Sequence, residues 1–152
     1  MKNLAPIALV ALLGPLDADA RTEECQPVTE AGIAGLFDGW NAALASGDPA
    51  QVVARYATRS ILLPTVSNTP RLTPEERRDY FEMFLQKKPQ GRIDVRQVEH
   101  GCNSAVDAGV YTFSFGDGSK VAARYTFTYG WDGKQWLITS HHSSAMPEAV
   151  AK

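Results

Sequence analysis

The chain has 152 residues, of which 44% are hydrophobic, so it is long enough to build one domain around a real core. Its formal net charge of −2 offers no basic surface of the kind that attracts nucleic acid. We therefore expect a single domain that has no nucleic-acid partner.

The first 20 residues differ in character from the rest of the chain. Lys2 gives a positive start, an apolar run follows over residues 4–16, and Ala18 and Ala20 are the small residues that a signal peptidase reads. The run is too short for a permanent membrane span. We predict a signal peptide over residues 1–20 and one domain over residues 21–152, periplasmic or secreted and free of the membrane after cleavage. A disordered cytosolic tail is the alternative.

Two cysteines remain after that cleavage, Cys25 and Cys102. An even pair in an exported protein favours a disulfide, which would be worth about 4 to 5 kcal/mol in the chain-entropy model for a loop of this length. It would hold the N-terminal arm against the rest of the domain. Two unrelated reduced thiols are the alternative, and no Cys-x-x-Cys motif indicates redox catalysis.

The first half of the chain predicts three helices. Thr29 is a good N-cap for a long amphipathic helix that ends at Gly47, and Asp48 with Pro49 starts a short second helix. Residues 73–76 form a capping box for the third helix, which runs until Pro89. The expected buried positions on the three helices are Ile33, Leu36, Phe37, Trp40 and Leu44, then Val52, Val53 and Tyr56, then Tyr80, Phe81, Phe84 and Leu85.

Strands dominate the remainder. A short apolar strand is expected over residues 60–63, and antiparallel strands over residues 92–98, 110–115, 121–131 and 136–144, separated by turn residues. The order of elements predicts an α+β domain in which helices pack on one face of a curved antiparallel sheet.

The last hairpin has two contrasting faces, because strand side chains alternate with a period of two. Arg124 shares one face with hydroxyl residues, and we predict that it lines a pocket, where a guanidinium needs an anion or carbonyl partner. An ion pair with Asp38 or Glu82 is the alternative. The opposite face is aromatic and too apolar to leave in water, which predicts a homo-oligomer, at least a dimer. It consists of Tyr125, Phe127, Tyr129 and Trp131.

His141 and His142 are neighbours on a strand and should point to opposite faces, so we expect no metal site here. His142 shares its face with Ile138 and is expected to point inward, where an imidazole could bind a carboxylate or act as acid or base. Asp94 and Asp107 are the acids of the strand region, and the alternation predicts that both face solvent.

Several short stretches together carry a family resemblance. They are residues 37–41 (FDGWN), residues 47–49 (GDP), residues 62–65 (LLPT) and residues 136–144 (WLITSHHSS). From residue 28 to residue 147 the chain resembles the nuclear transport factor 2-like (SnoaL-like) superfamily, and within it the bacterial stand-alone form of the calcium/calmodulin-dependent protein kinase II association (hub) domain.

This resemblance implies a cone-shaped sheet wrapped around a long helix and a deep pocket, with subunits that associate through the sheet. Trp136 and Ile138 match the closing strand of the kinase members, His142 takes the place of a histidine, and Ser143 replaces an arginine. Arg124 lies on the strand that brings another arginine inward in the family. The resemblance carries over no kinase or calmodulin activity.

We predict a hub-like, non-catalytic domain that self-associates and binds a small carboxylate or other polar ligand without a cofactor. Its alternative is a SnoaL-type isomerase, hydratase or cyclase, with His142 as acid or base and Arg124 orienting the substrate. The third hypothesis is a structural oligomer with a vestigial pocket. The predicted ligand-binding residues are Arg124, His142, Trp40, Tyr56, Tyr80 and Arg71.

Overall fold

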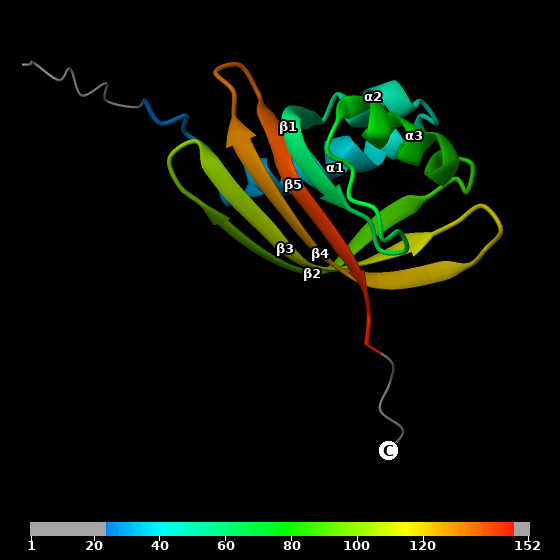
Figure 1. Cartoon of the computed structure of the whole chain (residues 1–152). Helices are drawn as coiled ribbons and strands as arrows, with labels where there is room; N and C mark the ends of the chain where they lie inside the picture. Colours follow the sequence, from blue (N-terminus) through cyan, green and yellow to red (C-terminus); the bar gives the residue numbers. More distant parts are fainter. Residues whose placement is uncertain (1–23, 148–152) are drawn as a thin grey trace, which may run out of the picture.

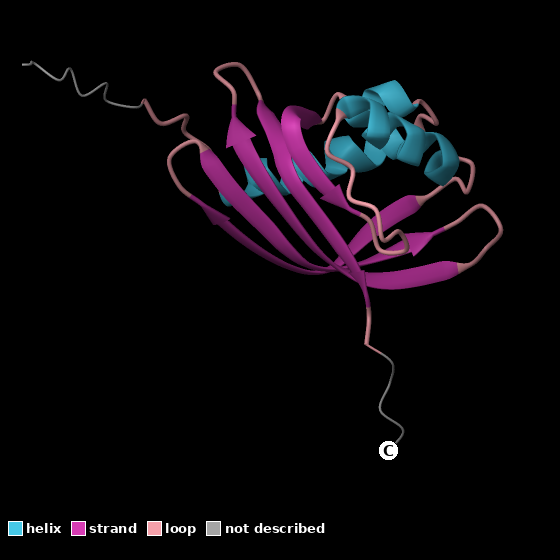
Figure 2. Cartoon of the chain, viewed as in Figure 1, coloured by secondary structure: helices cyan, strands magenta, loops and turns pink. Residues whose placement is uncertain are grey.

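The computed structural model describes residues 24–147, and the predicted signal peptide over residues 1–20 lies outside that range. A single sheet of five strands curves around three helices, all of which lie on its concave side (Figures 1 and 2). In the described part of the chain no helix has the length and apolar character needed to cross a membrane.

The three helices begin where their capping residues predict. Helix α1 (Glu30–Ala45) starts after Thr29, whose side chain accepts a hydrogen bond from the backbone N–H of Gly32. Helix α2 (Pro49–Val53) follows Asp48. Helix α3 (Pro74–Leu85) starts with the reciprocal capping box of Thr73 and Glu76. The sequence prediction of three capped helices is confirmed.

The sheet has the strand order β1-β5-β4-β3-β2, and its members are β1 (Tyr56–Leu63), β2 (Gln90–His100), β3 (Ser104–Ser114), β4 (Lys120–Trp131) and β5 (Trp136–Ala145). Strands β2 to β5 form an antiparallel meander, whereas β1 pairs in parallel with β5 at the edge. The α+β class is therefore confirmed. Tyr56 was expected on the second helix and instead begins β1.

Helix α1 covers the aromatic face of the meander. Its buried Phe37 and Trp40 contact the ring of Phe127 at centroid distances of 6.1 and 5.3 Å. Tyr125 and Tyr129, on the same face of β4, are also buried. The prediction that this face is exposed for assembly is wrong, because alternation separates the two faces of a strand without telling which one the helices cover.

A β-bulge in β5 reverses the alternation that the sequence suggested. Thr128 pairs with Ser140 but Tyr129 pairs with Ile138, so Thr139 is an extra residue on β5. Ile138 and His141 therefore both point inward, and the neighbouring His142 is exposed. The prediction that His142 shares the inner face with Ile138 is wrong for this reason.

Cys25 and Cys102 form a disulfide across a sequence separation of 77 residues. The bond joins the arm before α1 to the turn between β2 and β3. The Asn103 side chain reinforces this contact, since it accepts a hydrogen bond from the backbone N–H of Gln26 and donates one to the carbonyl of Glu24. The arm is thus tied to the sheet both covalently and by hydrogen bonds.

Candidate functional site

A cavity of about 560 Å³ lies between α3, the loop after β1 and the concave face of the sheet. Its volume suits a small molecule. Aromatic rings form a large part of the wall, so the site would favour an apolar, ring-shaped body over a compact ion. The aromatic lining residues are Trp40, Tyr80, Phe81, Phe84, Tyr111, Phe113 and Phe115.

The polar part of the cavity wall is centred on His141, which is 4% exposed. Its Nδ1 lies 2.9 Å from the hydroxyl of Tyr56, which in turn accepts a hydrogen bond of 3.2 Å from Nε1 of Trp40. The ring of Phe127 stacks on the imidazole with centroids 4.0 Å apart. The imidazole is therefore held at Nδ1 and on one face.

Burial keeps His141 neutral at physiological pH. Loss of water around the ring, with a smaller effect from the charge of His142, lowers the His141 pKa from 6.5 to about 3. Burial also raises the pKa of Tyr56 well above 10. The chain of contacts through these side chains consequently contains no formal charge near neutral pH.

Hydroxyl groups continue this chain to the cavity. Tyr111 lies 3.5 Å from Nε2 of His141 and donates a hydrogen bond of 2.6 Å to Oγ of Ser143. Ser143 is also hydrogen-bonded to the hydroxyl of Thr65, in the loop after β1. The cavity is lined by both residues of this last pair. They form a polar patch on an otherwise apolar wall.

The cavity lining also includes charged residues, which lie beside the apolar part of the wall. Lys87 and Lys88 are exposed and follow α3, and Asp117 belongs to the turn between β3 and β4. The guanidinium of Arg71 lies 5.9 Å from the ring centre of Tyr80, another lining residue. Burial raises the pKa of Tyr80 to about 12, with Arg71 acting in the opposite direction.

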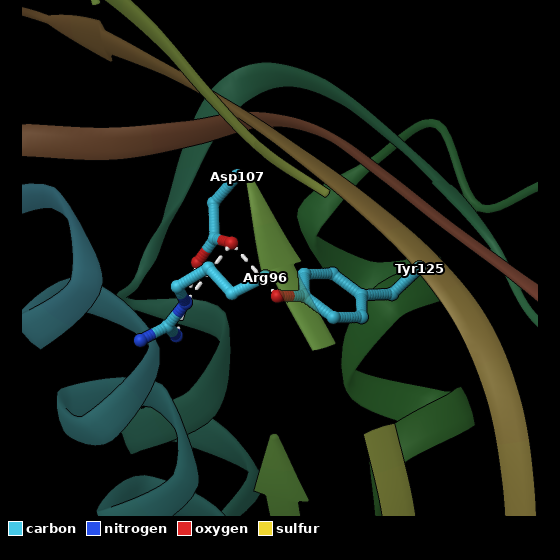
Figure 3. A network of polar contacts seen from close by, with 3 residues as sticks. All are labelled: Arg96, Asp107 and Tyr125. Carbon is cyan, nitrogen blue, oxygen red and sulfur yellow. Dashed lines mark hydrogen bonds and ion pairs between the residues drawn. The ribbon is translucent and has the colours of Figure 1, made fainter. Parts of the chain in front are cut away.

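A second polar cluster lies under α1 and lines no part of the 560 Å³ cavity. Figure 3 shows Arg96 and Tyr125 converging on Asp107. Arg96 forms an ion pair with Asp107 at 3.1 Å, and Tyr125 donates a hydrogen bond of 2.8 Å to the same carboxylate. Asp107 is fully buried, so the prediction that it faces solvent is wrong. A register shift between Ile93 and Val95 turns Arg96 inward to meet it.

Comparisons with known proteins agree with the fold. The calcium/calmodulin dependent protein kinase II association domain family matches residues 29–147. The chain belongs to this family. A Xanthomonas campestris protein named for the same association domain is 49% identical over 84% of this chain and 99% of its own, with a TM-score of 0.75. Comparison with curated proteins gives no match.

More distant structures share the fold of this association domain. A nuclear transport factor 2-like protein of unknown function from Pseudomonas putida is 18% identical, with a TM-score of 0.69 over 80% of this chain and 96% of its own. A protein with a cystatin-like fold from Nostoc punctiforme is 14% identical, with a TM-score of 0.68 over 81% and 97%. These identities show the fold alone.

The association domain places the six predicted ligand-binding residues in different surroundings. Trp40 and Tyr80 line the cavity, Tyr56 contacts it through His141, and Arg71 lies over Tyr80.

The other two, Arg124 and His142, are exposed on the convex face, so the prediction that they line the cavity is wrong. The guanidinium of Arg124 donates to the carbonyl of Ala145 at 3.3 Å, and it pairs with neither Asp38 nor Glu82 in the described part of the chain.

His141 and Ser143 were missed because both depend on the bulge at Thr139, which leaves no clear mark in the sequence. Tyr111 is one of several tyrosines in the sequence, and no sequence pattern distinguished it from the others as a site residue. Across residues 24–147 no cluster of three or more His, Cys, Asp or Glu side chains has the arrangement of a metal site.

We expect His141 to make folding stability depend on pH. Its pKa is about 3 in the folded state and about 6.5 in the unfolded chain, so below pH 6.5 only the unfolded chain takes up this proton. The free energy of unfolding should therefore fall between about pH 6.5 and pH 3, by on the order of 4 kcal/mol in total. Urea denaturation at a series of pH values measures it.

The adjacent histidines supply a matched control. His141→Gln should remove this part of the pH dependence, whereas His142→Gln should keep it, because His142 is exposed. Equal pH profiles for His141→Gln and the parent protein would contradict the assignment.

Proposed function

We propose that this association domain self-associates and holds a small polar or anionic molecule with an apolar body, without transforming it. The observation that carries the proposal is the 560 Å³ cavity, whose aromatic wall is interrupted by the hydroxyl groups of Ser143 and Thr65. Such a site combines a large apolar contact area with a few fixed polar groups, as small-molecule pockets commonly do.

The charges around the cavity support a ligand that is neutral or anionic. Lys87 and Lys88 offer two positive groups against the single carboxylate of Asp117, which already accepts hydrogen bonds from Ser119. Among the described residues no arginine lines the cavity. A carboxylate would thus meet ammonium groups, while its apolar body packs against the rings.

The protonation states favour binding over acid-base catalysis. A general acid or base works best with a pKa near the working pH, whereas that of His141 is lowered to about 3 and burial raises those of Tyr56 and Tyr111 above their ordinary range. Asp107 is engaged by Arg96 outside the cavity. Neither His141 nor these two tyrosines therefore has the near-neutral pKa that acid-base catalysis by an isomerase or hydratase would use.

Calorimetric titration with benzoate tests the binding function. Val121 lines the cavity and is 44% exposed, so Val121→Trp should obstruct the site without disturbing the core. We expect benzoate affinity to fall at least tenfold in this variant. Met83→Trp, at a 61% exposed position outside the lining, should leave the affinity unchanged. Equal loss in both variants, or an unaltered affinity in Val121→Trp, would count against the cavity.

The convex face of the sheet is our proposed surface for self-association. The family is an association domain, and the outer positions of the central strands β3, β4 and β5 include a patch of small, uncharged side chains, which a second copy could cover with little desolvation cost. The patch consists of Val106, Ala108, Thr126, Thr128 and Ser140.

Light scattering coupled to size exclusion measures the oligomeric state directly. We expect a dimer or larger assembly for the parent protein, and a monomer for Ala108→Arg, because an arginine at the centre of the patch would be buried without a partner. Glu82→Arg on the exposed side of α3 should keep the assembly. A parent protein that is monomeric at micromolar concentration would refute self-association.

Export is the remaining part of the proposal. The pattern of residues 1–20 and the Cys25–Cys102 disulfide support it, since structural disulfides persist mainly in oxidising compartments. Intact-mass analysis of the protein from a bacterial periplasm should show a chain that begins at Arg21 and has no free thiol. A full-length chain recovered from the cytoplasm would contradict export.

A further inference from the structure

The hydrogen bonds behind the cavity form a chain in which each residue donates its hydrogen to the next residue. They start at Trp40, whose indole nitrogen can only donate and whose partner, the hydroxyl of Tyr56, lies 3.2 Å away. Because Tyr56 receives this hydrogen, its own hydroxyl hydrogen is free for Nδ1 of His141 at 2.9 Å. Reversing the bond would leave the buried Tyr56 hydrogen without an acceptor, a cost comparable to a lost hydrogen bond.

The imidazole of His141 continues the same donor-to-acceptor order, because it accepts at one ring nitrogen and donates at the other. A neutral histidine that accepts at Nδ1 carries its hydrogen on Nε2, so His141 donates toward the hydroxyl of Tyr111 at 3.5 Å. The low pKa of His141 keeps the ring neutral over the working range of pH. Tyr111 then donates its own hydrogen to Ser143 at 2.6 Å.

One hydrogen is left over at the end of the chain. Ser143 and Thr65 have two hydroxyl hydrogens between them, and their mutual hydrogen bond uses one, whichever residue donates it. Ser143 has already accepted the hydrogen of Tyr111. In the described part of the chain no other hydrogen bond engages either hydroxyl, so the second hydrogen is available to the cavity.

We propose that this leftover hydrogen makes the cavity selective for ligands that present a hydrogen-bond acceptor, such as a carbonyl, carboxylate or hydroxyl oxygen, to Ser143 and Thr65. The inference rests on the proposed binding function and names the class of ligand. A bound molecule that offers only a donor would displace water and leave the hydroxyl hydrogen without a partner. Oxygen lone pairs tolerate incomplete pairing better than a buried donor does.

Three bicyclic probes of similar size separate the contributions. 1-Indanone presents an acceptor, indole presents only a donor, and indene presents neither. We expect 1-indanone to bind about tenfold more tightly than indole, the factor that corresponds to one hydrogen bond made in one complex and missed in the other. Dissociation constants come from chemical-shift titrations monitored by protein NMR.

Two substitutions at the half-buried Thr65 test the direction of the chain. Thr65→Ser keeps a hydroxyl group and should keep the preference. Thr65→Asp provides a carboxylate that accepts the Ser143 hydrogen and leaves only acceptors facing the cavity, so the preference should reverse in favour of indole. Indene affinity reports whether the cavity is intact in each variant.

The outcomes distinguish the two proposals. If none of the three probes binds the parent protein, the binding function fails. If indene binds but the parent protein does not prefer 1-indanone to indole, the cavity stands and the inferred selectivity is overturned. The same holds if Thr65→Asp retains the preference of the parent protein while indene still binds.

Discussion

The packing of His141 between aromatic side chains is the contact on which the fold and the candidate site both depend. Its imidazole stacks on Phe127 at 4.0 Å, and Trp40 of α1 meets it edge-on at 5.2 Å. Helix, sheet and cavity wall thus share one cluster. Since a charged ring could not remain in this apolar setting, the same packing that stabilises the core also keeps the site neutral.

Two further buried charged groups stabilise the framework of the domain and line no part of the cavity. Asp107 is neutralised by Arg96 under α1 and does not line the cavity. Arg77 is fully buried and donates instead to the carbonyls of Ala57, Thr58 and Ser60 on β1. It stabilises the irregular stretch of β1 that follows Tyr56. Buried charged side chains therefore support the framework, while the buried polar groups of the cavity wall, around His141 and Ser143, are neutral.

Local signals in the sequence were reliable where short-range chemistry decides the structure. Thr29, Asp48 and the Thr73–Glu76 capping box marked helix starts, because each side chain bonds to backbone groups two or three residues away. The faces of the strands were less predictable. The bulge at Thr139 shifts the alternation by one residue and so exchanges His142 for His141 at the cavity.

The sequence was sufficient to predict the α+β class and the starts of the three helices, since these follow from periodicity and capping, and its even number of cysteines favoured the Cys25–Cys102 disulfide. Which face of the sheet is covered, and with it the composition of the site, depends instead on how the helices pack against the sheet. A period of two divides β4 into the Arg124 side and the Tyr125 side, but the alternation alone does not tell which of the two sides is buried. The position of α1 over Tyr125 and Phe127 resolves the choice, because it buries the larger apolar area and leaves Arg124 in water.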